Sequence, residues 1–168
     1  MDVTAELEAP CTPEELFAWV EDLGRYPHWL DIVVRAEPVE PSHGDGGPAW
    51  SVDLRGRWGP FARSKRLRMV RTRHEPGHEV WFERAELDGR QHSAWTLRAS
   101  VAPAGPAPGA EAADGTHPVE GVDGVSVLTM RLHYDGRLFD AVVERLLAEE
   151  IRRSKPRLLA ALGVPSTD

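Results

Sequence analysis

Two polar side chains stand on the apolar stripe of the C-terminal segment. Between Phe139 and Leu162, large apolar residues recur at the spacing of one helical face. Glu150 falls four residues after Leu146 and Ser154 four residues after Glu150, so both lie on that face. A carboxyl group in an apolar cavity has a raised pKa and can act as a general acid or base near neutral pH. Glu150, aided by Ser154, is therefore a candidate catalytic pair for enolisation or dehydration.

The same carboxylate has a structural interpretation. Glu150 can form an ion pair with an arginine such as Arg131, or lie at the wet mouth of a cavity, and structural ion pairs are common. Arg131 and His133 alternate with Leu128, Met130 and Leu132, and they are expected to face solvent. We favour the structural interpretation of Glu150 and keep the catalytic one as the alternative.

Metal and cofactor motifs are weak or missing. His74 and His78 flank a Pro-Gly turn without a nearby third ligand. The phosphate-loop, dinucleotide-binding and serine-hydrolase motifs do not occur, so the sequence indicates no metal and no cofactor. Cys11 precedes a helix start that would lower its pKa, but no histidine stands beside it, which favours a structural cysteine.

One stretch is unusually basic for an acidic chain. The net charge is −7, which opposes binding to nucleic acid or to an anionic membrane. Residues 55–73 nevertheless carry a run of cations: Arg55, Arg57, Arg63, Lys65, Arg66, Arg68, Arg71 and Arg73. They predict either a phosphate- or RNA-binding surface or a solvated sheet face. We favour the solvated face, paired with Glu79, Glu83 and Glu86 of the next strand.

The elements that position these residues follow from periodicity. Val3, Ala5 and Leu7 alternate with polar residues as in a half-buried strand. A capping box at Thr12–Glu15 starts a helix that ends near Gly24, and 26–30 indicates a short second turn. Six further strands fit between the turn signals that follow: Ile32–Val39, Ala49–Trp58, Arg63–His74, Glu79–Leu87, His92–Val101 and Val125–Tyr134.

The ends of this pattern complete the fold prediction. Short connections favour an antiparallel meander. Residues 104–123, rich in Ala, Gly and Pro, are expected to form a mobile hairpin insert. The long helix over Phe139–Leu162 contains Pro156, which predicts a kink near Arg152 or a second helical segment. The class is α+β, a seven-stranded curved antiparallel sheet around a long C-terminal helix.

This order resembles the helix-grip fold of the START-like superfamily, known also as SRPBCC, and in particular its polyketide cyclase/dehydrase and lipid-transport branch. The resemblance covers nearly the whole chain and rests on the opening strand into Ala9-Pro10, on 13–17, on 26–29 and on the final helix. It implies a ligand cavity between the sheet and the C-terminal helix. It does not specify an activity, because similar frames serve enzymes, carriers and receptors.

If each strand buries its more apolar face, the lining of that cavity can be predicted. The candidates are Trp29, Trp50, Val52, Leu54, Leu67, Met69, Trp95, Leu97, Leu128, Met130, Leu132, Val143, Leu147 and Ile151. Such aromatic and thioether side chains suit a flat or irregular apolar ligand. The same residues would also be expected in a filled core.

The leading hypothesis is a binding protein for a hydrophobic or aromatic small molecule. The first alternative is a polyketide cyclase/dehydrase-like enzyme that uses Glu150, and the second is an interaction module acting through Arg55–Arg73. We expect one domain over residues 1–163 with a tail at 164–168, a monomer or homodimer, and no membrane insertion. A lone cysteine and an acidic N-terminus favour the cytoplasm.

Overall fold

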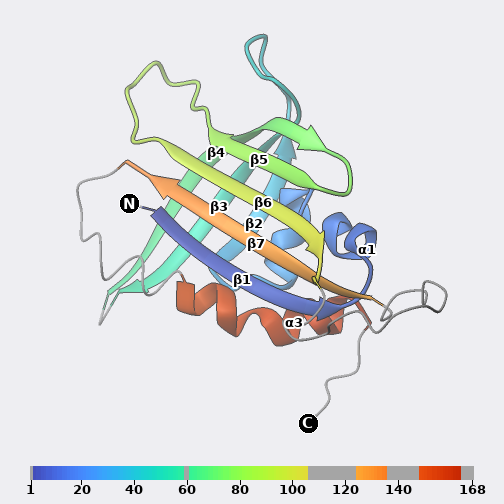
Figure 1. Cartoon of the computed structure of the whole chain (residues 1–168). Coiled ribbons are helices and arrows are strands. Elements are labelled where there is room, and N and C mark those ends of the chain that lie inside the picture. Colours follow the sequence, from blue (N-terminus) through green and yellow to red (C-terminus); the bar gives the residue numbers. More distant parts are fainter. Residues whose placement is uncertain (1, 59–60, 106–123, 136–147, 164–168) are drawn as a thin grey trace, which may run out of the picture.

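The computed structural model describes residues 2–58, 61–105, 124–135 and 148–163. Within these ranges, seven strands form one antiparallel sheet in the order β1-β7-β6-β5-β4-β3-β2 (Figure 1). The part from β2 to β7 confirms the predicted meander, whereas the pairing of the first strand with the last was not predicted. The strands are β1 (Asp2–Pro10), β2 (Val33–Val39), β3 (Ala49–Trp58), β4 (Phe61–Glu75), β5 (Glu79–Arg84), β6 (Trp95–Pro103) and β7 (Val125–Tyr134).

Alternation along the strands gives the sheet one apolar face. In β1, every second residue from Val3 to Ala9 is buried and the residues between them are exposed. The strand register places these residues beside apolar residues of the neighbouring strands, so that Leu7 lies opposite Leu128, which lies opposite Val101. This continuous face is concave, and we call it the inner face. The core of the protein lies against it.

The first helix is shorter than its apolar pattern predicted. The capping box is present: the Glu15 amide donates to Thr12 Oγ1 at 3.2 Å, and the Thr12 amide donates to Glu15 Oε2 at 2.9 Å. However, α1 spans only Pro13–Ala18, and a 3₁₀ helix, η1, follows at Leu23–His28. Asp22 causes this restart because its carboxylate accepts the Gly24 amide at 2.8 Å. Both elements bury side chains in the core, among them Phe17 and Tyr26.

The C-terminal helix also packs against the inner face, as predicted (Figure 1). Residues 148–153 are helical, the helix is interrupted at Ser154, and α3 continues over Lys155–Ala161. Pro156 has no amide hydrogen to donate, which accounts for a second helical segment at this point. Ile151 and Leu158 join the core. The predicted stretch before residue 148 lies outside the described residues, and none of the described helices is long and apolar enough to span a membrane.

The end of the sheet near α1 is held by a buried hydroxyl. Ser126 is fully buried, and its Oγ donates to the Cys11 carbonyl at 2.7 Å. This bond joins β7 to the link between β1 and α1, so the sheet and the first helix meet at a fixed position. The predicted hairpin insert between β6 and β7 lies for the most part outside the described residues, as does the predicted tail.

Candidate functional site

The predicted lining residues that the structure describes gather on the inner face. Those fully buried in the main core are Trp29, Trp50, Val52, Leu67, Met69, Leu128, Met130 and Ile151. Leu54, Trp95 and Leu97 pack against this core but are only half-buried, and Leu132 packs against Val3. Val143 and Leu147 lie outside the described residues. Sequence alternation therefore predicted which face of the sheet is buried. Most of the predicted lining residues, however, belong to a filled core.

Burial on the inner face decreases toward one end of the sheet. Along β6, Val101 and Ala99 are buried, whereas Leu97 and Trp95 are half-buried. The same change occurs along β7 from Met130 to Tyr134 and along β3 from Val52 to Leu54, and along β4 it runs from the buried Leu67 to the exposed Lys65. Strand register brings these positions together. We call this region the open end, comprising Leu54, Lys65, Trp95, Leu97, Leu132 and Tyr134.

The opposite end is closed by aromatic packing. Trp29 has no exposed surface and its ring lies 5.1 Å from that of Tyr26. Tyr26 and Trp50 both pack edge-on against Phe82, with ring centroids 6.3 and 5.6 Å apart. Burial raises the pKa of Tyr26, whose hydroxyl donates to the Val20 carbonyl at 2.9 Å. Trp29, predicted as a lining residue, is thus part of this closed packing. A ligand on the inner face would therefore bind at the open end.

A lysine lies at the open end among aromatic side chains. The Lys65 ammonium is 5.1 Å from the ring centroid of Trp95 and 5.3 Å from that of Tyr134, within cation–π range of both. The two rings contact each other across β6 and β7 at 4.8 Å. Sequence reasoning placed Lys65 in a solvated basic face and missed this position. The signal was present, since Lys65 alternates in phase with Leu67 and Met69.

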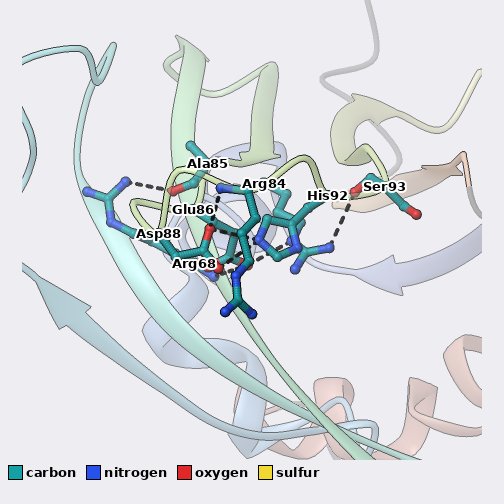
Figure 2. A network of polar contacts seen from close by, with 8 residues as sticks. Arg68, Arg84, Ala85, Glu86, Asp88, His92 and Ser93 are labelled. Carbon is teal, nitrogen blue, oxygen red and sulfur yellow. Dashed lines mark hydrogen bonds and ion pairs between the residues drawn. The ribbon is translucent and has the colours of Figure 1, made fainter.

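The neighbouring arginine of the inner face is already neutralised. Arg84 Nε donates to Glu86 Oε1 at 2.7 Å, and a terminal nitrogen of Arg84 donates to the Ser93 carbonyl at 3.4 Å (Figure 2). The Arg84 side chain is only 8% exposed. His92 contacts Asp88 at 2.9 Å in the same connection between β5 and β6. These contacts fold the connection against the sheet and leave the Lys65 ammonium, among the described side chains, as the unpaired cation at the open end.

The two candidate catalytic residues differ in their surroundings. Glu150 is half-buried beside the buried Ile151, and among the described residues no hydrogen bond or ion pair to its carboxylate is formed. Ser154 is buried, as predicted, but its hydroxyl donates to the Ile151 carbonyl at 2.5 Å. That bond keeps the hydroxyl within the helix. Arg131 does not pair with Glu150, and Arg131 and His133 are exposed, as expected.

Three described cations of the basic stretch, Arg66, Arg68 and Arg73, have acidic partners on the outer face. Arg66 binds Asp53 through two bonds of 2.6 and 2.9 Å. Arg68 binds Asp45 at 2.5 Å, a pair whose side chains are 11% and 6% exposed. The partners are thus mainly Asp53 and Asp45 rather than the predicted glutamates, although Arg73 does pair with Glu79 at 3.5 Å. This compensation favours the structural interpretation of the stretch over a nucleic-acid surface.

Further polar candidates from the sequence have structural contacts. Burial raises the pKa of the Cys11 thiol, with an added effect of the Glu15 carboxylate, so the expected lowering by the helix start is outweighed. His74 contacts Glu21 at 2.7 Å and so ties β4 to the segment after α1. In the ranges that the structure describes, no three His, Cys, Asp or Glu side chains are grouped as a metal site would require.

Together, the curved antiparallel sheet and the C-terminal helix against its inner face define a helix-grip, START-like fold. The chain belongs to the family described as polyketide cyclase / dehydrase and lipid transport, whose model matches residues 1–163. This result agrees with the resemblance inferred from the order of elements.

Solved structures with the same fold are distant in sequence. A START superfamily protein from Mycobacterium smegmatis is 16% identical, with a TM-score of 0.64 over 96% of this chain and 97% of that one. A protein from Thermus thermophilus is 15% identical, with a TM-score of 0.62 over 96% and 99% of the two chains. The di-domain ARO/CYC StfQ from the steffimycin biosynthetic pathway is 15% identical, with a TM-score of 0.58. The match covers 96% of this chain and 49% of StfQ. No curated protein matches the sequence.

The half-buried Arg68–Asp45 pair yields a stability prediction. Asp45→Asn removes the charge that compensates Arg68, so we expect the free energy of unfolding to fall by about 2 kcal/mol, the scale for losing a hydrogen bond between charged groups. Chemical denaturation monitored by tryptophan fluorescence measures this change. Asp53→Asn is the matched control, because its arginine partners are exposed and little change is expected. Equal losses in the two variants would contradict the assignment of Arg68–Asp45 as the structural pair.

Proposed function

We propose that this protein binds a hydrophobic or aromatic small molecule at the open end of its inner face, between the sheet and the C-terminal helix. The observation that carries the proposal is the decrease in burial along β3, β4, β6 and β7 toward one end. Apolar side chains that a filled core would cover remain half-buried there. Ligand sites in proteins are typically lined in this way, by apolar and aromatic groups with a few polar ones.

The comparisons agree with this proposal. The family description names lipid transport as well as polyketide chemistry, and both concern apolar or aromatic molecules. An interaction with another macromolecule through Arg55–Arg73 is less favoured, because Arg66, Arg68 and Arg73 already have acidic partners. A cytoplasmic location remains our proposal, supported by the single, buried cysteine.

The binding proposal is tested with N-phenyl-1-naphthylamine, an uncharged aromatic probe that fluoresces in apolar surroundings. We expect saturable binding with a dissociation constant on the order of micromolar. Leu97→Gln places an amide at the open end and should weaken binding about tenfold, since apolar contact is lost. Fluorescence titration measures both constants.

Thr96→Gln is the matched control, because Thr96 directly precedes Leu97 on β6 and faces the other side of the sheet. Its affinity for the probe should stay within about twofold of the original protein. Circular dichroism verifies that both variants are folded. Equal weakening in the two variants, or no saturable binding to the original protein, would contradict the proposed site.

A second candidate function is catalysis by Glu150 on a polyketide-like substrate. Its half-buried carboxylate has no ion-pair or hydrogen-bond partner among the described residues, and one structural neighbour is an ARO/CYC of a biosynthetic pathway. A carboxylate in this position could take a proton from the carbon between two carbonyl groups, and the resulting enolate carbon could then attack another carbonyl. Loss of water after that step would need the same group as an acid.

The substitution Glu150→Gln distinguishes the enzyme hypothesis from the hypothesis of a binding protein without catalytic activity. In an enzyme, the substitution should lower the turnover of a polyketide-like substrate by on the order of a hundredfold and leave its binding nearly unchanged. Glu149→Gln is the control, because Glu149 pairs with Arg152 and Arg153 on the exposed side of the helix. Product formation followed by liquid chromatography provides the measurement. Undiminished turnover in Glu150→Gln would exclude this role for Glu150.

A further inference from the structure

We propose that Lys65 makes the open end selective for ligands that carry an anionic oxygen group, such as a carboxylate, sulfonate or phenolate, on an apolar or aromatic body. This inference rests on the proposed binding function and adds the charge of the ligand to it. It is carried by the position of Lys65 at the open end of the inner face, by the neutralisation of the neighbouring Arg84, and by an indole donor beside Lys65.

The position of Lys65 follows from strand register. Lys65 lies opposite Leu54 on β3 and two residues before the buried Leu67, so its side chain lies on the inner face. The pairing of β4 with β5 ends at Met69, which lies opposite Arg84. Lys65 therefore has a paired strand, β3, on one side of β4 only. The ammonium therefore reaches the Trp95 and Tyr134 rings of β6 and β7.

The ammonium has capacity for an anion. A lysine ammonium carries three hydrogen-bond donors. Among the described residues, no hydrogen bond or ion pair to Lys65 is formed, and its contacts are with the faces of the two aromatic rings. Arg84, the nearest inner-face cation in the register, is bound to Glu86. Among the cations of this part of the inner face that the structure describes, Lys65 is thus the one without an ion-paired carboxylate.

A second polar group at the same place needs an acceptor. The Nε1 atom of Trp95 is buried and has no hydrogen-bond partner within the described structure. A buried indole N–H usually finds an acceptor, and leaving one unpaired costs free energy. An oxygen atom of a ligand bound beside Trp95 would satisfy this donor. Lys65 and Trp95 therefore select for the same type of ligand atom.

The electrostatic surroundings of Lys65 agree with this role. Burial lowers the pKa of Lys65, and the positive charge of Arg84 lowers it further, whereas Glu86 opposes the change. An ammonium that has lost part of its hydration gains more from an anion than one in open water. An anion at this site should therefore raise the pKa of Lys65, and a neutral ligand should not.

Two probes that differ in one charged group test the inference. 8-Anilinonaphthalene-1-sulfonate has the ring skeleton of N-phenyl-1-naphthylamine with an added sulfonate. Lys65→Met keeps an unbranched apolar side chain and removes the charge. We expect it to weaken binding of the sulfonate about tenfold and to change binding of the neutral probe less than twofold, since one close ion pair is lost. Lys65→Arg should retain sulfonate binding.

Arg131→Met is the matched control, because Arg131 lies between Met130 and Leu132 on β7, is exposed, and loses the same charge on the other face. It should leave the affinities for both probes unchanged. If Lys65→Met leaves the sulfonate affinity unchanged, or weakens both probes equally, the anion site is wrong while the binding function stands. If the original protein binds neither probe, the proposed function fails and the anion site with it.

The pKa provides an independent readout. The chain has only two lysines, Lys65 and Lys155, so ¹³C-methylation of lysine amines gives few NMR signals, which a Lys155→Arg variant assigns. The apparent pKa of the Lys65 signal should rise when the sulfonate probe is bound and stay constant with the neutral probe. A rise with both probes, or with neither, would overturn the assignment of Lys65 as the anion-binding group.

Discussion

The burial of one face of a seven-stranded sheet is the constraint on which the rest of the structure depends. Period-two alternation places the large apolar side chains of every strand on that face, and each must be covered to contribute to stability. The sheet curves, and α1, η1 and the C-terminal helix pack against the concavity. At the end near α1 this coverage is complete, because Tyr26, Trp29 and Phe82 fill the space. At the other end the described apolar side chains are only partly covered, and we propose that a ligand binds there.

Charged side chains are also compensated differently on the two faces of the sheet. On the outer face, Arg66, Arg68 and Arg73 pair with acids, which compensates part of the positive charge of the basic stretch. On the inner face, Arg84 is neutralised by Glu86, whereas Lys65 meets aromatic rings. A charge beside apolar groups is costly without a partner. Cation–π contacts lessen this cost, and an anionic ligand would lessen it further.

Sequence reasoning was most successful where periodicity alone decides. Alternation predicted all seven strands of the described sheet and their buried face, because a shift by one residue would expose the core. Short connections predicted the meander from β2 to β7, but the pairing of β1 with β7 was not predicted. Sequence reasoning was less successful at element ends: α1 ended early because Asp22 caps a new turn, a local bond that apolar spacing does not encode.

In the candidate site, too, periodicity predicted which face a residue lies on but not the contacts of its side chain. Ser154 was correctly placed on the buried face of the helix, but the bond that holds its hydroxyl depends on helix geometry around Pro156. Lys65 was missed because it was grouped with its basic neighbours by charge. Its alternation with Leu67 and Met69 was the better guide, and only the fold brings Trp95 and Tyr134, which are distant in sequence, beside it.

The indole resonances of the tryptophans test the location of the ligand most directly. In protein labelled with ¹⁵N at tryptophan, Trp95 reports on the open end of the inner face. Trp81 reports on the outer face, where it lies between Arg73 and Arg98. Addition of N-phenyl-1-naphthylamine should shift the Nε1–H signal of Trp95 and leave that of Trp81 in place. A shift of Trp81 with an unchanged Trp95 would place the ligand on the outer face and contradict the account.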